Sequence, residues 1–204
     1  HSMTTTIDTN APAYLDNGVI TDGEAWVPLQ THVESGSTTH TVTLQSSTGV
    51  NNWAQYQDLI LIIDARFLYS SATIYPYMYF NNDTTNANYE RQAVRNDSST
   101  GILAYMQSNP GVCFFPGASA TANAFGTAYV RIFDINSGKK KMLQCFNNHT
   151  GSTTASGINL SCVIWDTNGT NAINRIDHYS TSSSIYWAPN SRWDVFGVLP
   201  RMVS

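Results

Sequence analysis

The chain has 204 residues with ten basic and fourteen acidic side chains, a formal net charge of −4, and only 12% charged residues. This length fits one domain or two small ones, and a 42% apolar share supports a core, which excludes an intrinsically disordered chain. The mildly acidic balance, with basic residues clustered only at Lys139–Lys141, argues against nucleic acid as a partner. No apolar run reaches the roughly 18–20 residues of a membrane helix, so we expect no membrane insertion.

The composition favours strands over helices. Glu and Lys, which commonly cover helix surfaces, occur three times each, whereas Thr, Tyr, Val, Ile, Phe and Trp are abundant. The three cysteines, Cys113, Cys145 and Cys162, are too widely and irregularly spaced for a disulfide framework or a metal site. We expect Cys162, which lies in an apolar alternation, to be a small buried hydrophobic residue.

The first part of the chain predicts an irregular start followed by strands. Residues 1–3 resemble an expression scar, and residues 4–35 are expected to be an N-terminal arm or first strand region. Thr41–Gln45 alternates with period two, which predicts a strand with Val42 and Leu44 on one face. Asp58–Asp64 is the most apolar run and predicts a central strand buried on both faces. Its second face needs a cover, such as another segment of the chain or a neighbouring subunit.

A tyrosine stripe follows between residues 74 and 80. Ile74, Met78 and Phe80 share one face of the predicted strand, and Tyr75, Tyr77 and Tyr79 share the other. Pro76 removes one donor of the strand ladder, which predicts a sheet edge or a bulge.

The second half of the chain predicts two hairpins and a closing strand. Residues 127–135 and 139–146 flank a short turn that contains glycine. Residues 158–164 alternate so that Ile158, Leu160, Cys162 and Ile164 are expected to face the core. The turn signal Asn168-Gly169 predicts that residues 172–178 return as the next partner strand, and residues 193–199 form the last strand. The pattern predicts an all-β fold: a single jelly-roll-like antiparallel β-sandwich of about eight to ten strands over residues 36–204.

Catalytic and metal-binding motifs are missing from the sequence. The histidines are scattered without the spacing of a metal site, so we expect no metal and no cofactor. Asp134, Asp166, Asp177 and Asp194 could meet in space as a pair for glycoside cleavage, but nothing in their spacing predicts it. We therefore expect a protein that is not an enzyme.

The tyrosine stripe is the best candidate for ligand contact. Aromatic faces pack on sugar rings, so Tyr75, Tyr77 and Tyr79 are candidates for glycan binding, with hydrogen bonds from Asn147, Asn148 and His149. The alternative, which the sequence favours, is that the tyrosines pack within the sandwich or at a subunit contact. Likewise, Lys139–Lys141 could touch a phosphate or an acidic glycan, but we favour the interpretation that these lysines solvate a hairpin tip.

Four segments, in order, match the motifs of one known protein family. Tyr56–Arg66 is similar to the first long core strand of that family, and residues 79–89 are similar to its FNGDTxxNY motif, with Asn82 in place of glycine. Residues 125–141 are similar to its FG…I.I.DY…K stretch. Residues 173–176 and 189–198 are similar to its closing I..I and GSxxxLYGI motifs, with Asn190 in place of glycine and Val195-Phe196 in place of Leu-Tyr.

Together these segments resemble a domain of tailed-bacteriophage virion structural proteins. The resemblance implies a jelly-roll-like domain on a phage particle, in a tail-fibre, receptor-binding or capsid-decoration (cement) role. It implies oligomers, with a homotrimer expected, and contacts with other capsid or tail proteins and with a host-surface glycan. The expected location is the virion, after synthesis in the host cytoplasm. The family motifs are scaffold elements and carry over no catalytic or ligand-binding residue. Alternatives from other classes are a carbohydrate-binding module and a glycan depolymerase.

Overall fold

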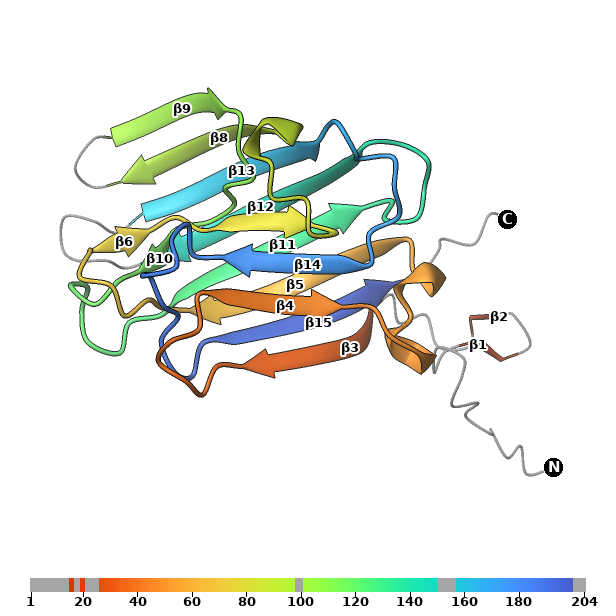
Figure 1. Cartoon of the computed structure of the whole chain (residues 1–204), viewed down its shortest axis with the longest axis horizontal. Helices are drawn as coiled ribbons and strands as arrows, with labels where there is room; N and C mark the ends of the chain where they lie inside the picture. The colour runs from red at the N-terminus through yellow and green to blue at the C-terminus, as the bar shows by residue number, and fades with distance from the viewer. Residues whose placement is uncertain (1–14, 17–18, 21–25, 98–100, 150–156, 200–204) are drawn as a thin grey trace.

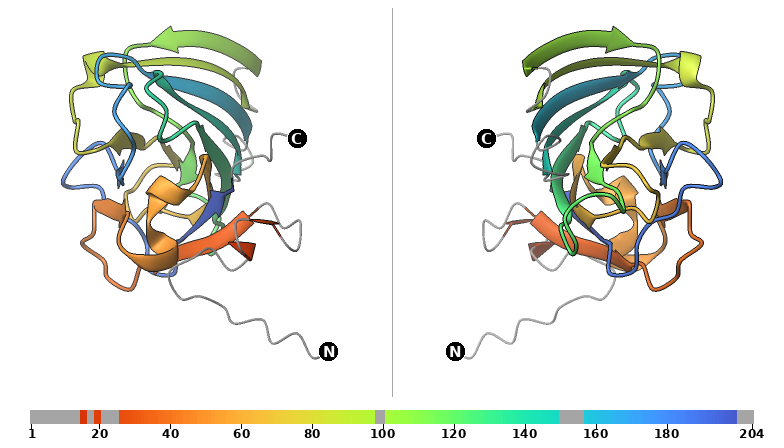
Figure 2. Two further views of the ribbon diagram at one scale, coloured as in Figure 1. Left: turned by 90° about the vertical axis from the view of Figure 1, so that its right-hand side faces the viewer. Right: turned by 90° about the vertical axis from the view of Figure 1, so that its left-hand side faces the viewer.

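Two antiparallel sheets form the body of the computed structural model, which describes residues 15–16, 19–20, 26–97, 101–149 and 157–199 (Figure 1). The larger sheet has eight strands in the order β3-β15-β5-β11-β12-β13-β8-β9, and the smaller has three in the order β4-β14-β7. Figure 2 shows the larger sheet curving around one side of the smaller. The prediction of an all-β antiparallel sandwich is confirmed.

The larger sheet consists of β3 (Trp26–Val33), β5 (Asp58–Ala65), β8 (Tyr89–Asp97), β9 (Gly101–Gln107), β11 (Gly126–Phe133), β12 (Lys141–His149), β13 (Gly157–Trp165) and β15 (Arg192–Val198). The smaller sheet consists of β4 (Thr41–Gln45), β7 (Tyr77–Phe80) and β14 (Arg175–Tyr179). Two short pairs complete the strands, β1 (Leu15–Asp16) with β2 (Val19–Ile20) and β6 (Thr73–Ile74) with β10 (Phe115–Pro116). The described helical elements are three 3-10 turns, η1 (Gly49–Asn51), η2 (Trp53–Gln55) and η3 (Asn86–Asn88).

The core fills the space between the two sheets. Leu59, Leu61 and Ile63 of β5 point into it and are fully buried, as expected from the apolar run. On the opposite face of β5, Ile60 is buried and Ile62 is half-buried, so the expectation of burial on both faces holds best at Ile60. Four tryptophans close the core: Trp53, Trp165, Trp187 and Trp193. Burial of one large apolar side chain contributes about 1.5–3 kcal/mol, so this cluster is a main source of stability.

Several predicted strands are confirmed. Residues 41–45 form β4 with Val42 and Leu44 buried, and β11 pairs with β12 as the predicted hairpin. β7 lies at an edge of the smaller sheet, and Pro76 stands between β6 and β7, outside any strand. The sandwich begins earlier than residue 36, because β3 pairs with β15 at one edge of the larger sheet.

The orientation predicted for residues 158–164 is wrong. Ile158 and Leu160 are 53% and 51% exposed, and Cys162 is half-buried on the same outer face, so Cys162 is not a core residue. The inward face instead carries the buried polar residues Asn159 and Ser161. Both side chains donate hydrogen bonds to the carbonyl of Val112, at 3.2 and 2.5 Å. A polar inner position is therefore stabilised by a loop from elsewhere in the chain, which no local pattern reveals.

The partner predicted for residues 172–178 is also wrong. β13 pairs with β12 on one side and β8 on the other, so it has no free edge for a returning strand. After Asn168-Gly169 the chain instead crosses to the smaller sheet, where β14 pairs with β4 and β7.

Two asparagines occupy the left-handed backbone region where the resembled family has glycine. Asn82 has φ 63° and Asn190 has φ 70°. Asparagine tolerates this region better than most residues with a side chain, so these two turns form without glycine.

Candidate functional surfaces

The three tyrosines of the predicted stripe do form a row, and they contact one another edge to face. Ring centroids lie 5.6 Å apart for Tyr75 and Tyr77 and 5.9 Å apart for Tyr77 and Tyr79. Tyr79 is only 5% exposed, its hydroxyl donates to Asn86, and burial raises its pKa to about 12. Tyr77 is half-buried and packs against the core cluster. The row is a packed layer rather than a set of open ring faces.

A hollow lies beside this row on the outer face of the smaller sheet. Its volume is about 600 Å³, and its lining is rich in hydroxyl and amide groups: Thr41, Thr43, Tyr79, Asn82, Thr84, Arg175, Asp177 and Tyr179. Arg175 Nε and Asp177 Oδ2 form an ion pair at 2.8 Å, and the Thr43 hydroxyl donates to Asp177 Oδ1 at 2.6 Å. Because its charges are paired, this hollow suits a neutral polar ligand.

The three polar residues predicted to assist the stripe lie in different environments. Asn147 is fully buried; its amide oxygen accepts from Phe114 N at 2.9 Å, and its amide nitrogen donates to three backbone carbonyls. Asn148 is exposed on the outer face of the larger sheet. His149 is half-buried and stacks on Phe114, with centroids 5.9 Å apart. Asn147 therefore holds the backbone and has no amide hydrogen to offer an outside ligand.

Phe114 joins two of the predicted residues and was not identified from the sequence. Tyr75 and His149 both stack on Phe114, with their ring centroids 5.3 Å and 5.9 Å from that of Phe114. Cys113, the preceding residue, faces Cys145 with their sulfur atoms 2.7 Å apart, and both thiols are fully buried. Burial raises the pKa of Cys113. The segment before β10 is thus held tightly against the inner face of β12 and β13, and it forms one wall of an arginine-containing hollow described below.

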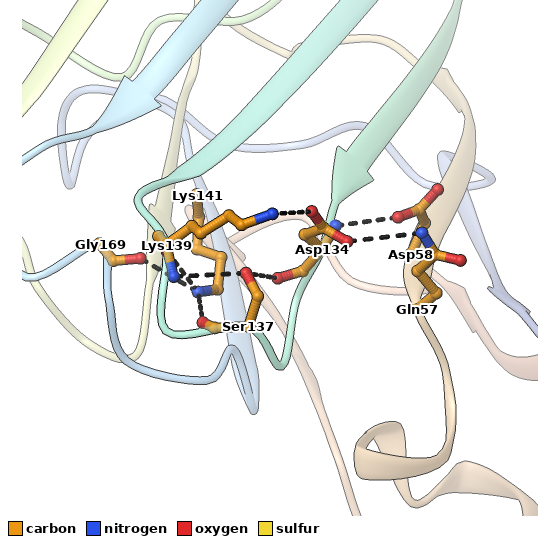
Figure 3. Close-up of polar contacts among 7 residues, drawn as sticks. All are labelled: Gln57, Asp58, Asp134, Ser137, Lys139, Lys141 and Gly169. Atoms are coloured by element: carbon orange, nitrogen blue, oxygen red, sulfur yellow. Dashed lines mark hydrogen bonds and ion pairs between the residues drawn. The ribbon is translucent and has the colours of Figure 1, made fainter. Parts of the chain in front are cut away.

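The four aspartates considered for glycoside cleavage each form an ion pair with a basic residue. Asp177 lies on the outer face of the smaller sheet, and Asp194 lies on the outer face of the larger sheet, bonded to Arg192. Asp166 pairs with Lys140. Asp134 lies at the end of β11, where it accepts from Gln57 and forms a 3.9 Å ion pair with Lys139 (Figure 3). Each carboxylate is paired with a basic residue near it.

The lysines of the same hairpin differ in exposure. Lys139 is 81% exposed, in line with a solvated tip, whereas Lys141 is fully buried. The Lys141 amine donates to the carbonyls of Ser137, Lys139 and Gly169, and burial lowers its pKa (Figure 3). The interpretation of all three lysines as surface residues is therefore wrong at Lys141.

The outer face of the larger sheet carries many apolar side chains. One row, in register from β5 to β9, consists of Ile62, Tyr129, Phe146, Leu160, Val94 and Ala104. Within it, Val94, Phe146 and Leu160 are 48–54% exposed. Ile102 and Met106 of β9 are 76% and 71% exposed. We call this surface the outer apolar face.

Neither a metal centre nor a membrane helix is found in the part of the chain that the structure describes. Among these residues no three His, Cys, Asp or Glu side chains gather as metal ligands, and no helix there has the length and apolar character to cross a membrane. One histidine is embedded in the core: His178 is fully buried, accepts from Trp193 Nε1 at 2.8 Å, and has its pKa lowered to about 3 by burial.

Comparison with known proteins gives no relative to guide the assignment of function. No protein-family model, curated protein or solved structure matches this chain.

Proposed function

We propose that this chain is a non-enzymatic surface protein of a tailed-bacteriophage particle, acting in a tail-fibre, receptor-binding or capsid-decoration role. It assembles as a homotrimer and contacts other virion proteins and a host-surface glycan. The observation that carries the proposal is the outer apolar face, which crosses the side of the larger sheet away from the core.

The amount of exposed apolar surface favours an oligomer over a monomer. Antiparallel strands with one buried face usually alternate apolar and polar residues, with the polar ones in water. Here the first half of β13 does the opposite, with Leu160 outward and Ser161 inward, and β12 adds Phe146 beside Leu160. Large exposed apolar patches mark interaction sites. Burial of this face between subunits also accounts for a chain with only 12% charged residues.

A closed ring is the assembly that best fits this surface. In a ring with cyclic symmetry, the apolar face of one subunit meets a different surface of the next, and the ring closes without leaving an open end. Three is the number that the resemblance to virion proteins implies.

A carbohydrate-binding module is the second candidate, and one observation favours it. The hollow beside the tyrosine row offers hydroxyl and amide groups next to Tyr79 and Tyr179, which is the chemistry of neutral sugar recognition. Glycan binding is common to both candidates, whereas trimerisation through the outer apolar face belongs only to the first.

Light scattering on two matched variants tests the assembly. The wild type should have three times the 22.5 kDa mass of the chain. Leu160→Lys places a charge in the outer apolar face and should give a folded monomer. Leu68→Lys is the control, because Leu68 is similarly exposed, at 42%, and lies outside that face. A monomeric wild type, or a trimeric Leu160→Lys variant, would contradict the proposed assembly.

Immunogold labelling of phage particles with an antibody against the chain tests the location. Labelling at the head supports a decoration role, and labelling at the tail supports a receptor-binding role. Absence of label from particles of a phage that encodes the chain would refute a place in the virion.

A further inference from the structure

A second hollow lies on the inner side of β8 and β9, where these strands reach beyond the edge of the smaller sheet (Figure 1). Its volume is about 270 Å³, and its lining combines two arginines with aromatic rings: Tyr75, Arg91, Arg95, Leu103, Tyr105, Gln107 and Phe114. The residues come from β8, β9, the link between β6 and β7, and the segment before β10. We call it the arginine hollow.

Arg91 is the unusual residue of this hollow. It is 1% exposed, and its guanidinium lies between two rings, 4.5 Å from the centroid of Tyr75 and 4.8 Å from that of Tyr105. Nη1 donates to Gln107 Oε1 at 3.3 Å and Nη2 donates to the Tyr105 hydroxyl at 2.7 Å. The Nε hydrogen has no acceptor among the described residues.

Three other arginines of the sandwich show what Arg91 lacks. Arg131, Arg175 and Arg192 each bond an aspartate, at 2.6 to 2.8 Å. Arg91 has only neutral partners in the described part of the chain, namely an amide, a phenol and two ring faces. A buried charge is stable when it is paired and fully hydrogen-bonded. An anion bound in the hollow would supply the charged partner that this guanidinium lacks.

Gln107 marks where an anion's oxygen would bind. Its amide oxygen accepts from Arg91 Nη1 and from Asn109 Nδ2, the latter at 3.3 Å. It also lies 2.9 Å from the Tyr75 hydroxyl, whose single hydrogen has a nearer acceptor in Asn109 Oδ1 at 2.7 Å. The Gln107 side chain is itself exposed, so it can swing away from this position. A carboxylate oxygen placed there would receive the same hydrogen bonds, now strengthened by its charge.

We propose that the arginine hollow binds the carboxylate of an acidic sugar, such as a uronic or sialic acid residue, in place of the Gln107 amide. The planar fork of arginine matches a carboxylate, and a second guanidinium, that of Arg95, lies 4.9 Å from the Phe114 ring centroid. The rings of Tyr75, Tyr105 and Phe114 offer apolar surface for the C–H groups of a sugar. This inference rests on the glycan contact of the proposed function, and it is independent of the trimer.

Titrations with two ligands that differ only in the carboxylate test the proposal. Methyl glucuronide should bind at least about ten-fold more tightly than methyl glucoside, as a charge-assisted pair implies. Sodium acetate should compete weakly, because it lacks the sugar ring. Equal binding of the two glycosides would overturn the proposal, and acetate as effective as the glucuronide would overturn its sugar part.

Four variants locate the effect. Arg91→Gln and Arg95→Gln should abolish the preference for the glucuronide, and the more exposed Arg95 provides the result if Arg91→Gln does not fold. Arg192→Gln, on the outer face of the larger sheet, is the control and should keep the preference. Gln107→Ala should bind the glucuronide as tightly as the wild type or more tightly, because the anion position is vacated. Loss of binding in Gln107→Ala, or a preference retained in both hollow arginine variants, would refute the assigned site.

The outcome is separable from that of the assembly. A trimer without preference for the glucuronide would refute only the arginine hollow. A monomer with the preference would refute only the proposed assembly.

Discussion

Acidification from pH 7 to pH 4 should destabilise the fold through one buried histidine. His178 is fully buried against Phe115, Trp187 and Trp193, and its pKa is lowered from 6.5 to about 3 by burial. Because the unfolded chain binds this proton at a higher pH than the folded chain does, stability is retained above pH 6.5 and falls as the pH decreases toward 3. The loss is about 1.4 kcal/mol per pH unit, or about 3 kcal/mol at pH 4.

Urea unfolding at pH 7, 6, 5 and 4, on the wild type and on His178→Gln, measures this effect. Glutamine retains an acceptor for Trp193 Nε1 but has no proton to gain. The other titrating groups are shared by the two proteins and cancel in the difference. The stability of the wild type should therefore fall relative to the variant by about 3 kcal/mol between pH 7 and pH 4. Curves that fall in parallel, or a His178 NMR titration with a midpoint near 6.5, would refute the reasoning.

Three further predictions concern single positions. Asn147→Ala removes a buried amide that holds the backbone before β10, and should cost about 3 kcal/mol by urea unfolding, whereas the exposed neighbour change Asn148→Ala should cost less than about 0.5 kcal/mol; equal costs would contradict this. Asn190→Gly should be about 1 kcal/mol more stable than Asn190→Ala, because φ is 70° at this position, and the opposite order by thermal unfolding would be inconsistent with a left-handed turn. Gly111→Ala places a methyl group 2.2 Å from the Tyr75 ring, so the ring must shift. This change should weaken glucuronide binding in the arginine hollow by a larger free energy than it lowers the stability of the fold. Unchanged binding would argue against Tyr75 as a wall of the site.

The local patterns of the sequence were sufficient to predict many of the strands and the class of fold. The alternation at Thr41–Gln45, the apolar run of β5 and the hairpin of β11 and β12 each depend on neighbours within a few residues or on one short turn. The left-handed conformation at Asn82 is likewise a local property, since it depends on the backbone preferences of asparagine and its neighbours.

The sequence indicated a tyrosine row but not what surrounds it. Period-two spacing correctly puts Tyr75, Tyr77 and Tyr79 in edge-to-face contact along one side. Which of these rings is open depends on side chains outside the strand: Asn86 accepts a hydrogen bond from the hydroxyl of Tyr79, and Phe114, distant in the chain, stacks on Tyr75.

By itself, the sequence determined that the chain is rich in strands, which residues alternate along them, and where several turns bend. Only the tertiary structure decided which face of β13 points inward and which sheet receives β14. The physical reason is that alternation defines two faces of a strand without stating which one is buried. At β13 the inward face carries the core residues Val163 and Trp165, and the Val112 carbonyl, about fifty residues away, accepts hydrogen bonds from Asn159 and Ser161 on that same face. The arginine hollow has the same origin, because its charges and rings become neighbours only when β8, β9 and two separate loops are folded together.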